Sequence, residues 1–421
     1  MKAPLNRKVY VVGYDVATAL GPTLESTWQR AVRGEAGFRR VTRCATTSRS
    51  NVVGEIPDWQ PRSLEFVERK DAYNWNADFV FLTMALCRRA LDHAGLAMDA
   101  RTAPRTACLV GSALNGSDAM RIAVENLAQK GPTKVSPYLL PNLCANLPAG
   151  KAGMLIGFTG PIFSPQGACA SGNHAIAIGS RMIRDGDCDF VIAGGVETCI
   201  LPEIIQGFAN MWATIKVEQG DRAYADPTQA SRPFSIDRKG FVLAEGGGVV
   251  VLAADEMVAD LGLKPRAEVL GVGWTSDAHH FTLPHEPTIV RAIHAAIDDA
   301  GLAPEDIEAI NAHGTSTPKG DAVEVACLRT VFGPALGRIP ISANKSQVGH
   351  TLGAAAGIEA VLGIEAMQQG LLLPTVNHRP DPAFDDIDVV PNQARRQAHE
   401  FLISNAFGFG GTNCCIVFRG V

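Results

Sequence analysis

Short apolar runs alternate with stretches of helical periodicity along the whole chain. The runs are rich in Val, Ile and Ala, and they predict buried strands at Val9–Val12, Ala107–Val110, Phe190–Ala193, Val249–Leu252, Ala267–Leu270, Ala309–Asn311, Pro340–Ser342 and Cys414–Phe418. Helical spacing covers Ala77–His93, Asn173–Arg184, Thr288–Ala300 and Ala354–Gln369. Because strands that are apolar throughout need cover on both faces, this alternation predicts an α/β fold with buried sheets.

Two passages of the first half resemble two passages of the second half in the same order. Residues 172–186 align with residues 356–370 through their Ala/Ile spacing, and the glycine-rich run before Val249 resembles the run before Cys414. Chance recurrence of glycine-rich turns would explain one such pair, whereas two pairs favour a duplication. We therefore predict an N-terminal half over residues 1–257 and a C-terminal half over residues 258–421.

Charge and cysteine usage narrow the class of protein. The formal net charge of −5 gives no general attraction to nucleic acid or to membranes. The ten cysteines form no CxxC pair, and several lie in apolar runs, which indicates reduced thiols rather than disulfides or a zinc site. Asp15 interrupts the first apolar run, and no window reaches the ~18 apolar residues of a membrane span. We expect a cytoplasmic protein.

A candidate nucleophile lies where an apolar run gives way to a helical pattern. Small residues surround Cys169 in the segment Gly167–Gly172. A thiol at the start of a helix meets unpaired N–H groups and the positive end of the helix dipole, which favour the thiolate. A small buried cysteine in a Gly/Ala-rich helix start explains the same pattern, so this segment alone leaves both interpretations open.

Three further segments carry polar groups next to predicted strands or helices. His313 follows a strand within Asn311–Thr317, and a second histidine ends Asn344–His350 just before a helix. Ser404–Asn413 is predicted to be a loop whose N–H groups line an anion site. Each segment alone is a weak signal, because a histidine at a strand end is more often a hydrogen-bonded core residue.

Taken together, and in this order, these segments resemble the elongating β-ketoacyl-acyl carrier protein synthases of the thiolase superfamily. The resemblance covers nearly the whole chain, and the spacing of Cys169, HGTST, Lys345, His350 and GFGGTN is specific. Other matching landmarks are Val11–Asp15, Ser231–Phe234, Asp237–Phe241, Glu245–Gly246 and Ser276–Ala278. The resemblance implies a five-layered αβαβα fold of two duplicated halves, usually as a homodimer.

The resemblance also implies a reaction. Cys169 would accept an acyl group, malonyl thioester would lose carbon dioxide, and a Claisen condensation would join the two units in fatty acid synthesis. The backbone N–H groups of Cys169 and Phe409 would hold the tetrahedral oxyanion. Neutral rings of His313 and His350 would hold the enolate by hydrogen bonds.

Other site residues are carried over from the same resemblance. Lys345 falls on the family's active-site lysine and Glu324 on its acidic partner, and we expect the two to pair or to share a network. A purely structural role for both is as plausible as direct catalysis. Thr315 and Thr317 match positions that bind the phosphopantetheine arm, and Phe409 matches a gate over the acyl pocket.

The resemblance also implies a protein partner, because the substrates of these enzymes are bound to a carrier. Phosphopantetheine arrives on an acidic acyl carrier protein, and no other cofactor and no metal are expected. Arg62, Arg69 and Lys70 lie where related enzymes dock the carrier, although neighbouring glutamates dilute the charge. The chain is expected to form a homodimer, or a heterodimer with a chain-length factor.

Two departures and three rival functions remain. Gln166-Gly167 stands before the nucleophile where relatives often have a hydroxyl residue, and Met211–Tyr224 is longer than expected, so acyl specificity is expected to be unusual. The same chemistry in a polyketide or polyene pathway is one rival. A non-catalytic chain-length partner would lack Cys169. A degradative thiolase would use a second cysteine near the C-terminus, where Cys414 and Cys415 lie within a predicted strand.

Overall fold

A single eleven-stranded sheet runs through the molecule. The computed structural model describes residues 7–61, 64–67 and 77–421. Within them the strand order is β13-β11-β10-β15-β16-β9-β1-β8-β6-β4-β5. The bounds are β1 Val9–Ala17, β4 Thr106–Gly111, β5 Ile162–Phe163, β6 Phe190–Glu197, β8 Gly246–Ala254, β9 Ala267–Ser276, β10 Ala309–Asn311, β11 Pro340–Ser342, β13 Asp388–Val389, β15 Phe401–Gly408 and β16 Thr412–Gly420. Short strands β2 Arg39–Arg40, β3 Val52–Gly54 and β7 Leu243–Ala244 form a second sheet, and β12 Leu371–Leu372 pairs with β14 Arg395–Arg396.

The large sheet consists of two half-sheets with mirrored strand order. They join at β1 and β9 through only the pairs Tyr10–Glu268 and Val11–Ala267. On one side β8 is antiparallel to β1 and to β6, and β4 and β5 then run parallel to β6. On the other side β16 is antiparallel to β9 and to β15, and β10 and β11 then run parallel to β15. The two halves therefore repeat one strand pattern.

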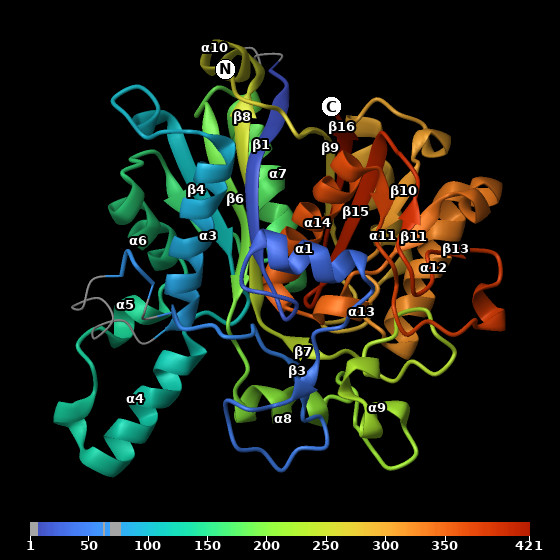
Figure 1. Cartoon of the computed structure of the whole chain (residues 1–421), viewed down its shortest axis with the longest axis horizontal. Coiled ribbons are helices and arrows are strands. Elements are labelled where there is room, and N and C mark those ends of the chain that lie inside the picture. The colour runs from blue at the N-terminus through green and yellow to red at the C-terminus, as the bar shows by residue number, and fades with distance from the viewer. Residues whose placement is uncertain (1–6, 62–63, 68–76) are drawn as a thin grey trace.

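Helices cover both half-sheets and fill the space between them. Helices α3 and α6 pack on the first half-sheet, α11 packs on the second with α12 beside it, and α7 and α14 lie between the two (Figure 1). The bounds are α1 Leu24–Val32, α3 Asp78–Ala94, α4 Ser117–Lys130, α5 Leu139–Leu143, α6 Leu147–Ile156, α7 Ser171–Arg184, α8 Pro202–Asn210, α9 Arg222–Ala225, α10 Asp255–Leu261, α11 Glu286–Asp299, α12 Pro318–Phe332, α13 Lys345–Val348 and α14 Ala355–Gln369. This is the five-layered αβαβα arrangement predicted from the sequence. Among the described residues, none of these helices has the length and apolar character to cross a bilayer.

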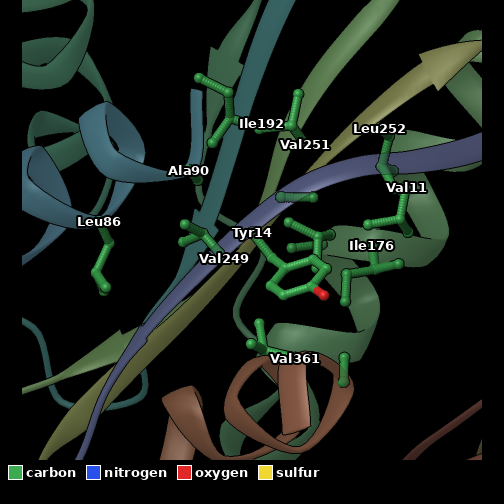
Figure 2. Close-up of a cluster of buried hydrophobic side chains, with 14 of the residues drawn as sticks. Val11, Tyr14, Leu86, Ala90, Ile176, Ile192, Val249, Val251, Leu252 and Val361 are labelled. Carbon is green, nitrogen blue, oxygen red and sulfur yellow. The ribbon is translucent and has the colours of Figure 1, made fainter. Parts of the chain in front are cut away.

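Apolar side chains from strands and helices interlock around the first half-sheet (Figure 2). Val11 on β1, Val251 on β8 and Ile192 on β6 are fully buried or nearly so. Tyr14 lies in the same cluster, where its hydroxyl donates a hydrogen bond of 2.6 Å to Oε2 of Glu365 on α14. The buried hydroxyl is thus satisfied, as burial of a polar group requires.

Glycines allow the two central helices to approach each other closely. A Cβ atom at Gly172 on α7 would lie 2.4 Å from the backbone nitrogen of Gly357 on α14. A Cβ atom at Gly357 would in turn lie 2.4 Å from the carbonyl oxygen of Gly248 on β8. This contact brings the N-terminal ends of α7 and α14 together.

Most of the elements predicted from the sequence are confirmed. Each predicted strand lies within an observed strand, and the four predicted helices match α3, α7, α11 and α14 to within two residues at either end. The predicted loop Ser404–Asn413 is wrong: most of it is the end of β15 and the start of β16, and only Phe409–Gly411 forms the turn between them. The division at residues 257 and 258 stays a prediction, and it falls within α10.

The glycine contact predicts the cost of one added methyl group. Gly357→Ala should lower the free energy of unfolding by about 1–3 kcal/mol, because the backbone of Gly248 cannot move away without disturbing β8. Gly207→Ala on the exposed side of α8 is the matched control, since its new Cβ would meet no atom within 4 Å. Urea unfolding of both variants measures the difference, and equal stability would refute the constraint.

Candidate active site

One large cavity contains most of the candidate residues. Its volume is about 630 Å³, and Cys169, His313, His350 and Phe409 all line it. These residues come from segments that lie far apart in the sequence and that meet between the two half-sheets. The cavity therefore brings the predicted nucleophile, both histidines and the predicted gate together.

A tight turn presents Cys169 at the base of the cavity. Ala168 has a φ of 48°, a left-handed conformation that costs energy in a residue other than glycine. The hydroxyl of Ser171 accepts a hydrogen bond from the N–H of Gly167 and donates one to the carbonyl of Ala168. Thr412 on β16 donates a further bond of 2.7 Å to the carbonyl of Gly167. The turn is thus fixed by bonds from both halves of the chain.

Burial raises the pKa of the Cys169 thiol to about 11. Lys345 and the backbone N–H groups of Phe409 and Cys169 oppose this rise, while the carboxyl of Glu197 adds to it. The stabilisation of the thiolate that was expected from the start of the helix is therefore outweighed by desolvation. These two N–H groups are the pair predicted to hold an oxyanion. Both lie within hydrogen-bonding reach of the sulphur and lower the pKa of the thiol.

Both histidine rings are held in one tautomer. Nδ1 of His350 accepts a hydrogen bond of 3.3 Å from the N–H of Leu352, and Nδ1 of His313 lies 3.4 Å from Nζ of Lys345. A backbone N–H and an ammonium group are donors only. In a neutral ring with an acceptor at Nδ1, the proton is on Nε2, so each ring keeps one N–H donor for another partner.

Burial also keeps both rings neutral. It lowers the pKa of His313 and of His350 well below the ordinary value, and the positive charge of Lys345 lowers both further. The ring centroids lie 5.6 Å apart at an angle of 87°. Two neutral imidazole rings thus lie next to each other in the cavity that the thiol also lines.

Lys345 pairs with a carboxylate that the sequence analysis did not identify. Its Nζ donates to Oε1 of Glu359 at 2.5 Å and to the carbonyl of His313 at 2.7 Å. Glu324 instead accepts the N–H groups of His313 and Gly314 at 2.8 and 2.7 Å. Of the two expected arrangements, a direct pair or a shared network, the structure has the network, because both groups bind the backbone of His313. Lys345 itself is fully buried and lies outside the cavity lining.

Phe409 stands at the tip of the turn between β15 and β16. Its side chain is 36 % exposed, and its ring lies 6.4 Å from the ring of Phe208 on α8. The next residue, Gly410, has a φ of 82° and donates its N–H to the carbonyl of Phe281. The ring is thus a partly open wall of the cavity rather than a buried core residue.

Thr315 and Thr317 lie along the same cavity. Their hydroxyl oxygens are 2.9 Å apart, and the hydroxyl of Thr317 also accepts the N–H of Gly320 at the start of α12. One hydroxyl therefore caps a helix, while the pair presents polar atoms to the cavity.

The two departures noted in the sequence both border the cavity. Gln166 lines it and donates to Oδ1 of Asn115, and a Cβ at Gly167 would lie 2.6 Å from Nδ1 of His174. The first residues of the long segment Met211–Tyr224 line the cavity. Further along this segment, Asp221 forms an ion pair of 2.7 Å with the fully buried Arg232.

Sequence reasoning missed two buried carboxyl groups. Glu359 is a charged residue within an otherwise apolar stretch of helix, which was the available signal. Glu197 ends β6 and accepts hydrogen bonds from Ser112, Ala113, Leu114 and Gly353. Burial raises its pKa to about 7. Glu197 thereby ties together two backbone segments that border the cavity.

Two further sets of residues were predicted from the sequence, the docking residues and the C-terminal cysteines. Arg62, Arg69 and Lys70, the predicted docking residues, lie outside the described residues. Cys414 and Cys415 are fully buried within β16, and neither lines the cavity. They are not placed to act as the second cysteine of a thiolase.

Known proteins match the chain over almost its full length. The family model described as the beta-ketoacyl synthase N-terminal domain matches residues 6–257, and that of the C-terminal domain matches residues 266–379. The chain is 34 % identical to 3-oxoacyl-[acyl-carrier-protein] synthase 2 of Staphylococcus aureus (strain COL) over 418 residues, 98 % of each chain. It is 34 % identical to the protein of the same name from Vibrio harveyi over 419 residues, 99 % of each chain.

Solved structures match the fold equally well. The ishigamide ketosynthase/chain length factor superposes with a TM-score of 0.89 at 29 % identity, covering 99 % of this chain and 100 % of that one. A beta-ketoacyl synthase from Burkholderia phymatum STM815 gives the same TM-score, identity and coverage. A type II polyketide synthase ketosynthase in complex with its acyl carrier protein gives 0.89 at 26 % identity and full coverage of both chains. The chain belongs to the beta-ketoacyl synthase family of condensing acyltransferases.

Proposed function

We propose that the protein condenses an acyl group on Cys169 with a malonyl unit carried by acyl carrier protein, and so elongates fatty acids. The observation that carries this proposal is the cavity itself, which is lined by a thiol with two backbone donors and by two neutral imidazole rings. Each of the two charged species in the reaction, the tetrahedral oxyanion and the enolate, then has its own pair of donors.

Acyl transfer takes place at Cys169. Its sulphur attacks the thioester carbonyl of the incoming acyl group, and the carrier's thiol leaves with the proton that the cysteine loses. Because burial keeps the thiol protonated at rest, charge develops on sulphur only as the substrate binds. The N–H groups of Cys169 and Phe409 stabilise the oxyanion that forms.

Condensation uses the two histidines. Loss of carbon dioxide from the malonyl thioester leaves an enolate whose oxygen accepts the Nε2–H groups of His313 and His350. The enolate carbon attacks the acyl carbonyl, the bond from carbon to the sulphur of Cys169 breaks, and the thiolate takes up a proton. Lys345, Glu359 and Glu324 act by positioning the His313 loop.

The partner follows from the substrate. The names of the curated relatives and of one solved complex include an acyl carrier protein. We assign Thr315 and Thr317 to its phosphopantetheine arm, because both hydroxyls line the cavity. The carrier supplies the only prosthetic group that the reaction needs, and the docking roles of Arg62, Arg69 and Lys70 and the homodimer belong to the same proposal.

A second function has specific support. One structural neighbour is the ketosynthase of a type II polyketide synthase, and another is a ketosynthase/chain length factor. The same site would then extend a polyketide or polyene chain, and a heterodimer would replace the homodimer. Higher identity to fatty acid synthases over equal coverage favours the first function.

Acylation and product mass test the function directly. Incubation with an acyl carrier substrate should place the acyl group on Cys169, and addition of malonyl carrier should release a β-ketoacyl product and carbon dioxide. Peptide mass spectrometry and product analysis measure both steps. An adduct mainly on Cys414, or the absence of condensation after acylation, would contradict the proposal.

Variants of the histidines separate the two half-reactions. His313→Ala and His350→Ala should still form the acyl-enzyme, while release of carbon dioxide should fall by ~10²–10³ because one enolate donor is lost. His313→Gln is the matched control, since its side-chain amide can return an N–H near the place of Nε2, and it should recover part of the rate. Normal decarboxylation in both alanine variants would refute the role.

Phe409→Ala tests a gate that covers the thiol until an acyl chain displaces the ring. Because Phe409 is partly exposed, its removal should change melting little while altering the ratio of acylation to condensation rates. Phe418→Ala on β16, where the ring is fully buried, is the control and should lose about 3–5 kcal/mol. Strong destabilisation by Phe409→Ala with unaltered chemistry would exclude the gate.

A further inference from the structure

A strained, exposed tryptophan stands at the mouth of the catalytic cavity. Trp212 follows α8, is 78 % exposed and has a φ of 57°. A bulky residue rarely adopts this left-handed conformation, and such strain persists only where the surroundings impose it. The N–H of Trp212 donates to the carbonyl of Ala209, and the N–H of Ala213 donates to that of Phe208. The end of α8 thus holds the indole at the mouth.

Trp212 also separates the catalytic cavity from a second, polar cleft. This cleft has a volume of about 280 Å³, and its polar lining consists of Thr47, Ser48, Arg49, Gln206, Asn210, Lys216 and Glu218. Trp212 is the residue that lines both spaces. A flexible arm that leaves the catalytic cavity past the indole therefore enters this cleft next. Figure 1 shows α8, which borders both spaces, close to the short strands β3 and β7.

Lys216 is the free cation of the cleft. Its ammonium group lies 3.0 Å from the centroid of the Trp212 ring, and it has no carboxylate partner among the residues that the structure describes. Arg49, by contrast, is paired with Glu218 at 2.8 Å. A cation on an aromatic face in contact with solvent is held only weakly, so an anion can compete for it.

The backbone around Lys216 is firmly anchored. Its neighbours Ile215 and Val217 are both buried, whereas Lys216 is partly exposed and lines the cleft. The N–H of Ile215 donates to the carbonyl of Phe241, and the N–H of Val217 donates to that of Arg49. Backbone hydrogen bonds on either side of Lys216 therefore fix its position in the fold.

We propose that this cleft binds the phosphate of the phosphopantetheine arm, with Lys216 as its cation and Trp212 as the wall that the arm passes. The inference rests on the proposed function, because the arm is the part of that substrate that joins the thioester to the carrier. The phosphate is the anionic group of the arm, and a protein of net charge −5 needs a local cation to hold it. The hydroxyls of Thr47 and Ser48 supply further donors.

A rival cation stands on the other rim. Lys319, in the first turn of α12, lines the catalytic cavity near Thr317. A phosphate bound there would make Lys319 the determinant instead. The test therefore compares the two lysines.

The probes are an acyl-phosphopantetheine thioester and the same acyl-pantetheine thioester without phosphate, and the readout is single-turnover acylation of Cys169. The wild-type protein should reach half-saturation at a roughly three- to tenfold lower concentration of the phosphorylated donor. Lys216→Met should abolish this difference and leave the unphosphorylated donor unaffected. Lys216→Arg should retain it, and the matched variant Lys319→Met should retain it as well. Melting curves confirm that each variant is folded.

Three results would overturn the inference. Equal half-saturation by both donors in the wild-type protein would show that the phosphate is not recognised. Loss of the difference in Lys319→Met, but not in Lys216→Met, would place the phosphate on the opposite rim. If neither thioester donor nor the acyl-loaded carrier protein acylates Cys169, the proposed function itself is refuted, and the phosphate site with it.

Discussion

The close contact between α7 and α14 is the constraint on which the rest of the site depends. Gly172, Gly357 and Gly248 leave no room for a Cβ atom between the two helices and the sheet beneath them. Cys169 precedes α7 and His350 precedes α14, so this approach brings the proposed nucleophile and one histidine into one cavity. A wider spacing would separate the thiol from the histidine proposed to act with it, and catalysis by proximity tolerates little displacement.

Burial then sets the electrostatics of that cavity. The same desolvation raises the pKa of Cys169 and lowers the pKa of both histidines, so these three groups are neutral at rest. In the proposed reaction, charge develops only where hydrogen-bond donors are already in place. The buried ammonium of Lys345 is tolerated because Glu359 and the carbonyl of His313 bind it. This pair fixes the His313 loop, and it also keeps Nδ1 of that ring an acceptor.

The mouth of the cavity is built from different groups than its base. At the base, short hydrogen bonds and buried carboxyl groups hold each backbone segment. At the mouth, the exposed rings of Trp212, Phe281 and Phe409 and the segment after α8 form the surface that a substrate meets first. The start of the long segment Met211–Tyr224, which differs from the expected family pattern, lies here, so a difference in substrate choice can arise without disturbing Cys169 and the histidines.

The sequence by itself was enough to predict most of the long strands, the central helices and the candidate residues Cys169, His313 and His350, because local periodicity and motif spacing can be read from the order of residues. It did not determine that Lys345 pairs with Glu359 rather than Glu324, since that choice depends on which face of α14 meets the lysine. It indicated a stabilised thiolate at the start of a helix but not the desolvation that opposes it, because burial cannot be read from neighbouring residues. The tertiary structure alone decided the tautomers, the protonation of the thiol and the place of Trp212 between two cavities. Each of these depends on contacts between residues far apart in the chain, for which neighbouring positions carry no signal.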